Sequence, residues 1–300
     1  MAGFDEIFET LRSRDHKKRM VAAWGVDDHT VSAAAKAVGL GLVDVTLVGD
    51  EGMIADVCSK EGIDVSIFTV VHEPVELKAV ALAVQMVKDG AGDFLMKGLC
   101  STDKFLRAVL NKETGLLPPK GTLTHCGVLE IPGYHKLLFF GDAAVIPAPD
   151  LKQKQIIMDF LVKTAKAVGV SVPKVAIIAA TEQVLASQPA TMEAAQLSKM
   201  ADRGQIKGCI ADGPLALDVA IDRESAEIKG VVSPVAGDAD CLLFPNIESG
   251  NVFYKANSKL VAGVRQAGLL VGAKVPCVLS SRADSTDTKL NSIAIAAMSV

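Results

Sequence analysis

Hydroxyl and basic side chains gather in the segment Ser280–Asp287, with the sequence SSRADSTD. An apolar run precedes this segment and an amphipathic run follows it, so Arg282 stands where a strand ends and a helix begins. The first N–H groups of a helix are unpaired and electropositive, and a guanidinium binds phosphate oxygens through paired hydrogen bonds. A helix cap accounts for Asp284 or Ser285. It does not account for Arg282, because a cation near a helix N-terminus is unfavourable without an anionic partner. Two interpretations therefore stay open, a simple cap and an anion site.

The segment Lys97–Thr102 also runs from a predicted strand end to a predicted helix start. Lys97 is followed by a glycine, and Arg107 lies about one turn into the helix. Ser101 or Thr102 is an ordinary N-cap, and an isolated Arg107 is typical of a protein surface. Their combination with a glycine at the strand end favours a second anion-binding element.

Three segments in the C-terminal half combine small residues with turn residues: Asp212–Pro214, Ser233–Asp240 and Phe244–Asn251. Small residues let a ligand approach the backbone, although turn chemistry explains any one segment alone. Their occurrence together in one part of the chain favours a ligand-binding surface. The candidate contact residues are Ser233, Pro234, Gly237, Asn246, Ser249, Gly250 and Asn251.

Several other kinds of site find no support in the sequence. The five histidines have no metal-ligand spacing, and neither GxxxxGK[ST] nor GxSxG occurs. The net charge of −4 gives no long-range attraction for nucleic acid or an anionic membrane, so an anionic ligand needs a few placed cations. The six cysteines are scattered without a CxxC pair, which is typical of reduced thiols in the cytoplasm.

Apolar runs of strand length alternate with segments of helical period along the chain. This pattern predicts an α/β fold of mostly parallel sheets with helices on both faces, and ligands beyond the carboxyl ends of the strands. The predicted strands are 21–24, 43–48, 67–71, 94–96, 175–179, 208–211, 241–244 and 277–280. The predicted helices are 30–38, 75–88, 103–110, 152–168, 191–201, 249–266 and 286–298. Pro and Gly residues in 116–133 interrupt the alternation, and we predict chain crossings between domains near residue 118 and near 268–274.

Together these segments resemble the phosphate acetyltransferase and phosphate butyryltransferase family, and the butyryl branch is closer. From Asp212 onward, DGPLALDVAI, SPVAGDAD, LLFPNIESGN, YK and SSRADS follow in the family's order. The resemblance implies two α/β domains similar to those of isocitrate and isopropylmalate dehydrogenases, with the active cleft between them. It places 1–118 and 269–300 in the first domain and 119–268 in the second, and it implies a homodimer or a higher homo-oligomer.

The family reaction converts a short acyl-CoA, such as butyryl-CoA, and inorganic phosphate into an acyl phosphate and coenzyme A, by direct transfer in a ternary complex. Coenzyme A is then a substrate, and we expect no permanently bound cofactor, no metal and no nucleic-acid or membrane partner. Ser281 matches the family serine that hydrogen-bonds near the reacting sulfur, and Arg282 matches the arginine that binds phosphate or the oxyanion. Arg107, in STDKFLR, matches an arginine that contacts the anionic substrates.

The chain departs from the acetyl branch at the position of the proposed base. That branch has an aspartate proposed to deprotonate the thiol of coenzyme A, and ungapped alignment places Thr288 there. Asp287 is adjacent but points about 100° away around a helix. Asp287 or Asp284 could substitute as the base, or cationic neighbours alone could activate the thiol. We identify no counterpart of a second acetyl-branch arginine expected in the first domain.

Two alternatives keep the fold and change the function. One is an isocitrate-type dehydrogenase that uses NAD and a metal, for which four carboxylates could imitate a metal-binding cluster: Asp212, Asp218, Asp238 and Asp240. The lack of an arginine-rich pocket for a hydroxyacid disfavours it. The other is a non-catalytic CoA-binding module, because Thr288 leaves the base unassigned.

Overall fold

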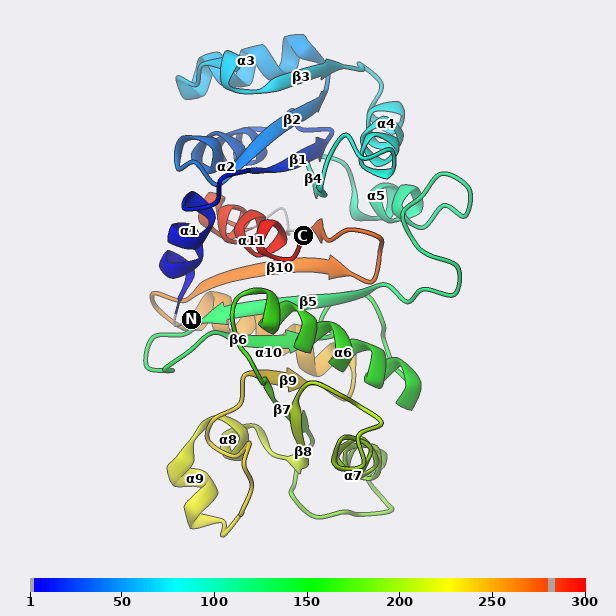
Figure 1. Cartoon of the computed structure of the whole chain (residues 1–300), viewed down its shortest axis with the longest axis vertical. Helices are drawn as coiled ribbons and strands as arrows, with labels where there is room; N and C mark the ends of the chain where they lie inside the picture. The colour runs from blue at the N-terminus through cyan, green and yellow to red at the C-terminus, as the bar shows by residue number, and fades with distance from the viewer. Residues whose placement is uncertain (1–2, 280–283) are drawn as a thin grey trace. The chain divides into compact units, whose positions relative to one another are not determined.

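Strands joined by helices make up most of the chain (Figure 1). The computed structural model describes residues 3–279 and 284–300. They form two compact units, each described here by itself. Unit 1 contains Gly3 and Thr124–Gln266, and unit 2 contains Phe4–Leu123 and Ala267–Val300.

The sheet of unit 2 has the strand order β3-β2-β1-β4-β11-β10. The first five strands are parallel, and β10 pairs with β11 in the antiparallel direction. The strands are β1 (Lys18–Ala23), β2 (Val43–Gly49), β3 (Thr69–His72), β4 (Phe94–Lys97), β10 (Arg265–Val271) and β11 (Cys277–Val278). All residues of β4 are buried, as expected for a strand that is covered on both faces.

The helices of unit 2 include one that lies in the protein interior. They are α1 (Phe4–Arg12), α2 (Asp28–Gly39), α3 (Glu51–Glu61), the 3-10 helix η1 (Val65–Ile67), α4 (Glu76–Lys88), α5 (Thr102–Val109) and α11 (Thr286–Met298). α11 packs against α1 and α2 (Figure 1). Every residue from Thr288 to Met298 is buried, so the polar side chains of α11 need partners inside the protein.

The sheet of unit 1 has the strand order β5-β6-β9-β7-β8, with β5 and β6 antiparallel and the other neighbours parallel. The strands are β5 (Thr124–Glu130), β6 (Leu138–Gly141), β7 (Lys174–Ile178), β8 (Ile210–Leu215) and β9 (Cys241–Leu243). The helices are α6 (Leu151–Ala167), α7 (Pro189–Asp202), α8 (Leu217–Ile221), α9 (Arg223–Ile228) and α10 (Ile247–Leu260). In the core of the unit, the ring of Phe140 lies 5.4 Å from that of Phe253 and 6.3 Å from that of Phe244, centre to centre.

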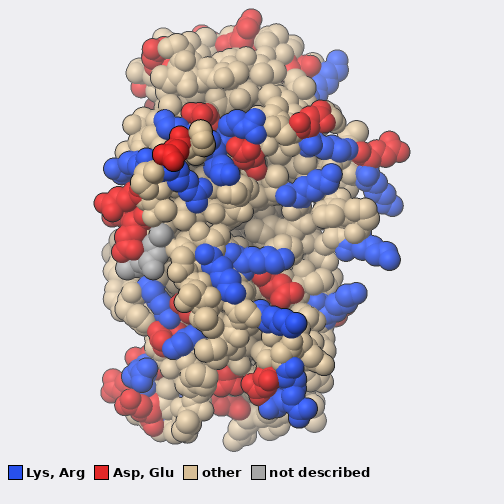
Figure 2. Space-filling model, in the orientation of Figure 1, with Lys and Arg blue, Asp and Glu red and all other residues tan. Residues whose placement is uncertain are grey.

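The exposed charges are mixed in sign. On the face shown in Figure 2, acidic and basic side chains are intermingled, in keeping with a net charge of only −4. Within residues 3–279 and 284–300, no helix combines the length and the apolar character that crossing a bilayer requires.

Most predicted elements are confirmed, and the helix predicted at 286–298 coincides with α11. β10, however, begins inside the predicted helix 249–266, and that prediction is wrong at its C-terminal end. α10 ends at Leu260, and Gly263 then has a φ of +76°, a left-handed conformation through which a helix cannot continue. The short segment that follows forms a strand because it pairs with β11.

β5 lies in the stretch that was predicted to be irregular because of its Pro and Gly residues. Gly127 is the reason that its strand pattern is weak. A Cβ at Gly127 would lie 2.2 Å from the ring of Phe140, so the glycine permits close packing inside the sheet. A further correction concerns Asp212–Pro214, which lies inside β8 and does not follow a strand.

The chain passes from unit 2 to unit 1 between residues 123 and 124 and returns between residues 266 and 267. The predicted domain boundaries were 118/119 and 268/269. The arrangement that the resemblance implies, two domains with a cleft between them, stays a prediction.

Candidate active site

The loop between β4 and α5 is held in place by a glycine and a buried lysine. A Cβ at Gly98 would lie 2.2 Å from the carbonyl oxygen of Trp24, so only glycine fits there. The ammonium of Lys97 is buried and donates hydrogen bonds to the carbonyl oxygens of Gly98, at 3.1 Å, and Cys100, at 2.9 Å. Lys97 therefore fixes the loop that leads into the predicted anion-binding segment.

The start of α5 has the predicted cap. The Ser101 hydroxyl accepts a hydrogen bond from the backbone N–H of Lys104 at 3.3 Å, and Thr102 is the first residue of the helix. The side chain of Arg107 is 79% exposed and pairs with Asp103, one turn earlier, at 3.1 Å. Because exposed pairs of this kind contribute little to stability, Arg107 is available to an anionic ligand.

The segment after β11 is the strongest feature of the sequence, and only its end belongs to the described residues. β11 ends at Val278, which pairs with Met96 of β4. Ser281 and Arg282 lie outside the described residues. Ser285 caps α11, because its hydroxyl accepts a hydrogen bond from the Thr288 N–H at 3.1 Å, so the predicted helix cap is confirmed.

Asp287 and Thr288 lie on different sides of α11. The Asp287 carboxylate is 70% exposed and lies 2.6 Å from the ammonium of Lys36 on α2. Thr288 is buried, and its hydroxyl oxygen lies 3.1 Å from that of Ser285. The helical period predicted this divergence, and the role of Asp287 as a base stays a prediction.

A second buried lysine, Lys289, follows Thr288 and was not among the predicted site residues. Its side chain is 6% exposed and interacts electrostatically with Asp27, Lys97 and Asp284. Burial is the main cause that lowers the pKa of Lys289, and the charge of Lys97 lowers it further. The carboxylates of Asp27 and Asp284 act in the opposite direction, but the pKa stays below its ordinary value. The signal in the sequence was weak, because an amphipathic helix normally exposes its lysines, whereas α11 is buried at every residue from Thr288 to Met298.

The buried lysines Lys97 and Lys289 and the half-buried carboxylates Asp27 and Asp284 together form what we call the charge cluster. Asp27 is its most informative carboxylate. One oxygen, Oδ1, caps α2 by accepting a hydrogen bond from the Thr30 N–H at 3.0 Å. The other, Oδ2, is buried and has no hydrogen-bond partner among the described residues. The cluster lies where β4 ends and α2 and α11 begin, which is the edge where ligands of parallel sheets bind.

The predicted contacts Asn246–Asn251 in unit 1 stabilise the start of α10. Asn246 caps the helix by accepting a hydrogen bond from the Ser249 N–H at 3.0 Å, and Asn251 donates one to the carbonyl oxygen of Ala143 at 3.0 Å. A Cβ at Gly250 would lie 2.4 Å from the carbonyl oxygen of Asp142. These residues therefore hold α10 against the chain that follows β6.

Asn246 and Ser249 also border an open apolar groove of about 620 Å³, next to the end of β9. The other residues of the groove are Leu217, Phe244, Glu248, Val252, Phe253 and Ala256. Val252 is 66% exposed and Phe253 packs against the core of unit 1. The structure thus brings two of the predicted contacts to one apolar surface.

The predicted contacts Ser233, Pro234 and Gly237 form a turn beside α8 and α9. Ser233 accepts a hydrogen bond from the Val235 N–H at 3.1 Å. Gly237 has a φ of +69°, and a Cβ there would lie 2.6 Å from the Cα of Arg223. Close packing of the turn therefore explains Gly237 without a ligand.

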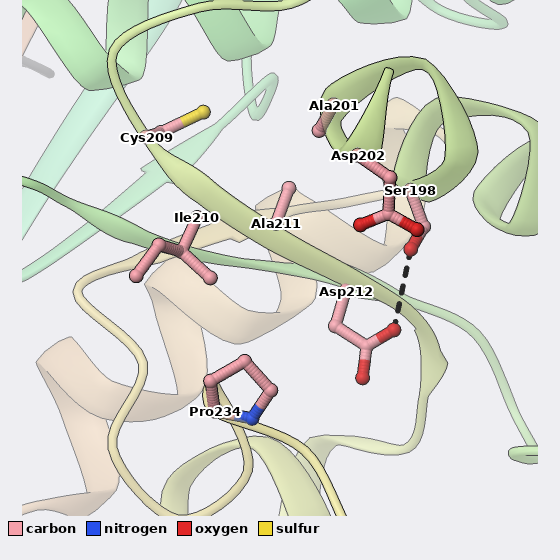
Figure 3. A pocket seen from close by; sticks show the side chains of 8 residues that line it. All are labelled: Ser198, Ala201, Asp202, Cys209, Ile210, Ala211, Asp212 and Pro234. Carbon is pink, nitrogen blue, oxygen red and sulfur yellow. Dashed lines mark hydrogen bonds between the residues drawn. The ribbon is translucent and has the colours of Figure 1, made fainter. Parts of the chain in front are cut away.

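Pro234 also lines a pocket of about 350 Å³, shown in Figure 3. The pocket is lined by Ser198, Ala201, Asp202, Cys209, Ile210, Ala211, Asp212 and Pro234. Figure 3 shows Ser198 reaching from α7 to Asp212, and their oxygens lie 3.3 Å apart. The pocket lies at the amino end of β8, opposite to the end at which parallel sheets bind ligands.

The four carboxylates that could imitate a metal-binding cluster do not form one: Asp238 and Asp240 share Lys136, and no group of three possible metal ligands occurs among the described residues. Asp238 pairs with Lys136 at 2.8 Å and with Lys174 at 2.5 Å, whereas Asp218 pairs with Lys229 at 2.9 Å. Burial works to raise the pKa of Asp238, but hydrogen bonds from Lys136, Lys174 and His135 outweigh it and hold that pKa well below its ordinary range. This arrangement removes the feature on which the dehydrogenase alternative was based.

Comparisons with known proteins agree with one another. Residues 51–297 match the family described as phosphate acetyl/butaryl transferase. The chain is 47% identical over 295 residues to a phosphate butyryltransferase of Clostridium acetobutylicum, covering 98% of this chain and 97% of that protein. It is 40% identical over 294 residues to a phosphate acetyltransferase of Thermotoga maritima, covering 98% of each. A branched-chain phosphotransacylase from Enterococcus faecalis V583 has a similar structure, with a TM-score of 0.82, 28% identity and coverage of 94% of this chain and 98% of that one.

Proposed function

Since the chain belongs to the phosphate acetyl/butyryl transferase family, we propose that it moves a short acyl group, butyryl or a similar one, between coenzyme A and inorganic phosphate. The observation that carries this proposal is the 47% identity to a phosphate butyryltransferase over 98% of the chain. Identity to the phosphate acetyltransferase of T. maritima is lower, at 40%, which favours the butyryl reaction. The resemblance inferred from the motifs is thereby confirmed at the level of the family.

In the proposed reaction, a phosphate oxygen attacks the thioester carbonyl and coenzyme A leaves as the thiol. The attack forms an oxyanion, which needs hydrogen-bond donors or cations where the charge develops. Phosphate and acyl-CoA are both anionic, so bringing them together in a ternary complex is a large part of the catalytic task. Coenzyme A acts as a substrate in this scheme and not as a resident cofactor.

We assign the reacting groups to two segments of unit 2. Ser281 and Arg282 follow β11 in the sequence. Lys97 is the last residue of β4, and Ser101, Thr102 and Arg107 come after it. The pairing of Val278 with Met96 supports this assignment, because β11 and β4 are neighbouring parallel strands and so end at the same edge of the sheet. Arg282 is proposed to bind phosphate or the oxyanion, and Ser281 the region of the sulfur.

The remaining features of the resemblance stay proposals. They are an active cleft between two domains similar to those of isocitrate dehydrogenase, substrate contacts from Ser233 to Asn251, a homodimer or higher homo-oligomer, and a cytoplasmic location. Asp287 stays a candidate base, although its carboxylate is engaged by Lys36 on the exposed side of α11.

The proposal is tested by measuring thiol release from butyryl-CoA with and without phosphate. We expect release that depends on phosphate and yields butyryl phosphate, and a series of acyl-CoAs that gives the chain-length preference. One methylene more or less in the acyl chain changes the free energy of discrimination between two substrates by only about 1–3 kcal/mol. The series therefore has to include acyl chains that differ by a single methylene. Binding of coenzyme A without any phosphate-dependent release would instead favour the non-catalytic module.

A further inference from the structure

Lys289 is a buried, ionisable side chain that has no role in the scheme above. It lies in the first turns of α11, and its side chain is 6% exposed. Lysine is almost never buried to this extent, because removing an ammonium from water costs several kcal/mol unless the protein compensates it. Asp27 and Asp284 supply part of that compensation, and the position of Lys289 at the ligand-binding edge of a parallel sheet makes it a candidate for a function.

The surroundings of Lys289 act on its proton in opposite directions. Burial disfavours the ammonium form most, and Lys97, at the end of β4, disfavours it by like-charge repulsion. Asp27, before α2, and Asp284, before α11, favour it. The N-terminal end of α11 is a further electropositive element. The net effect lowers the pKa of Lys289, so its proton is given up more readily than that of a surface lysine.

The proposed reaction needs a group that exchanges a proton with sulfur. When phosphate attacks acyl-CoA, the leaving group is a thiolate that has to be protonated to give the thiol. In the opposite direction the thiol has to lose its proton, since the thiolate is the nucleophile. A positioned acid–base side chain typically contributes about 10²–10⁴-fold to such a step.

We propose that Lys289 is the acid–base residue that exchanges this proton with the sulfur of coenzyme A. In acyl phosphate formation, a bond forms between a phosphate oxygen and the carbonyl carbon, the carbon–sulfur bond breaks, and the ammonium of Lys289 gives one proton to the sulfur. In the reverse direction, its neutral amine takes the proton of the thiol, the sulfur attacks the carbonyl carbon of the acyl phosphate, and phosphate leaves. This inference rests on the proposed function.

The other ionisable groups nearby are less suited to this task. Lys97 uses its ammonium to hold the β4–α5 loop through two carbonyl oxygens, so its contribution is a fixed positive charge beside Lys289. Asp287 faces away and is 70% exposed in its pair with Lys36. A desolvated lysine next to a second cation is an established way to activate an amine in proteins.

The test compares Lys289→Met, Lys289→Ala and Lys289→Arg with the wild type, in both directions of the reaction and between pH 6 and 10. We expect Lys289→Met to lose about 100-fold or more of kcat in both directions. In the wild type the rate of coenzyme A acylation rises with pH as Lys289 loses its proton. In the variants the rise follows only the ionisation of the free thiol, whose pKa is about 8.5, so the profile changes its midpoint. Lys60→Met, an exposed lysine on α3, is the matched control and keeps wild-type rates and pH profile.

Lys289→Arg separates proton transfer from a purely electrostatic role, because arginine keeps the charge but does not lose its proton in this range. We expect it to be as slow as Lys289→Met, and wild-type rates in Lys289→Arg overturn the proposal. Should Lys289→Met or Lys289→Arg lower the melting temperature strongly, the decisive measurement is rescue of Lys289→Ala by added ethylamine. Recovery of activity with ethylamine supports proton transfer by Lys289. Failure of ethylamine to restore activity overturns the proposal. A wild-type protein without phosphate-dependent transfer contradicts the proposed function itself, which is a different outcome.

Discussion

The carboxylate of Asp287 lies 2.6 Å from the ammonium of Lys36, on the exposed side of α11, whereas its neighbour Lys289 is buried in unit 2. Two residues that are two positions apart on a helix point about 160° apart, and α11 is exposed at Asp287 but buried from Thr288 onward. The ion pair engages Asp287 at the surface, and the interior is left to Lys289. This relationship separates Asp287 from Lys289 as candidates for proton transfer.

Replacing Asp287 by asparagine is expected to leave the pH dependence of turnover unchanged. The exposed pair with Lys36 contributes less than about 1 kcal/mol, so the melting temperature also changes little. Parallel pH profiles of Asp287→Asn and the wild type in the acylation of coenzyme A check this. Loss of the ascending part of the profile in Asp287→Asn would instead establish Asp287 as the base.

Replacing Arg282 by alanine is expected to reduce turnover by about 10²–10³-fold, the usual effect of removing a group that stabilises a developing oxyanion. The reason is its sequence position, where a cation stands just before the electropositive start of a helix and is expected to bind an anionic ligand. Steady-state kinetics with butyryl-CoA and phosphate measure the loss, and circular dichroism checks the fold. Arg203→Ala, at the exposed C-terminal end of α7, is the control. Near wild-type rates in Arg282→Ala remove this residue from the mechanism.

Replacing Gly98 by alanine is expected to destabilise the protein by about 1–3 kcal/mol and to lower activity. The added Cβ would lie 2.2 Å from the carbonyl oxygen of Trp24, so the β4–α5 loop has to move away from β1. Urea unfolding and kinetics measure both effects. Gly39→Ala is the matched control, because a Cβ at Gly39 meets nothing within 4 Å. Equal stability of the two variants contradicts the assigned packing.

The ion pairs of Asp238 predict a pH dependence of stability. Its pKa is lower in the folded protein than the ordinary value of 3.8, so the unfolded chain takes up a proton more readily. The stabilisation is fully present above that value and is lost progressively as the pH falls below about 4. At pH 7, Asp238→Asn is expected to lower the melting temperature, by about 2–4 °C for each kcal/mol by which the free energy of unfolding falls.

Melting curves of the wild type and Asp238→Asn between pH 3 and 7 check this prediction. The difference between their melting temperatures should shrink towards acid pH. Asp202→Asn, at an exposed pair with Lys199, is the control and shows no such convergence. If the two melting temperatures differ by the same amount at every pH, the ion pairs of Asp238 are not the cause of the pH-dependent stability.

Most of the secondary structure follows from local patterns, and the exceptions have identifiable causes. α11 is predicted at its observed bounds, because Ser285 caps it and apolar residues such as Leu290, Ile293 and Ala297 recur at helical spacing. β5 and β10 are missed, because Gly127 and the short run after Gly263 are strand-forming only through their neighbours. Such strands form mainly because they pair with neighbouring strands, and the intrinsic strand propensity of their residues contributes less. The predicted elements also lack β6 and four helices, which are α1, α3, α8 and α9.

The sequence by itself determined the family and the segments that carry its chemistry, since SSRADS and STDKFLR are recognisable as residue types in order. The tertiary structure alone decided which charges are buried and what they face. Lys97 and Lys289 are 192 positions apart in the chain and look like ordinary lysines in it. Burial and the neighbourhood of Asp27 and Asp284 set them apart, because desolvation and nearby charge depend on contacts between distant segments.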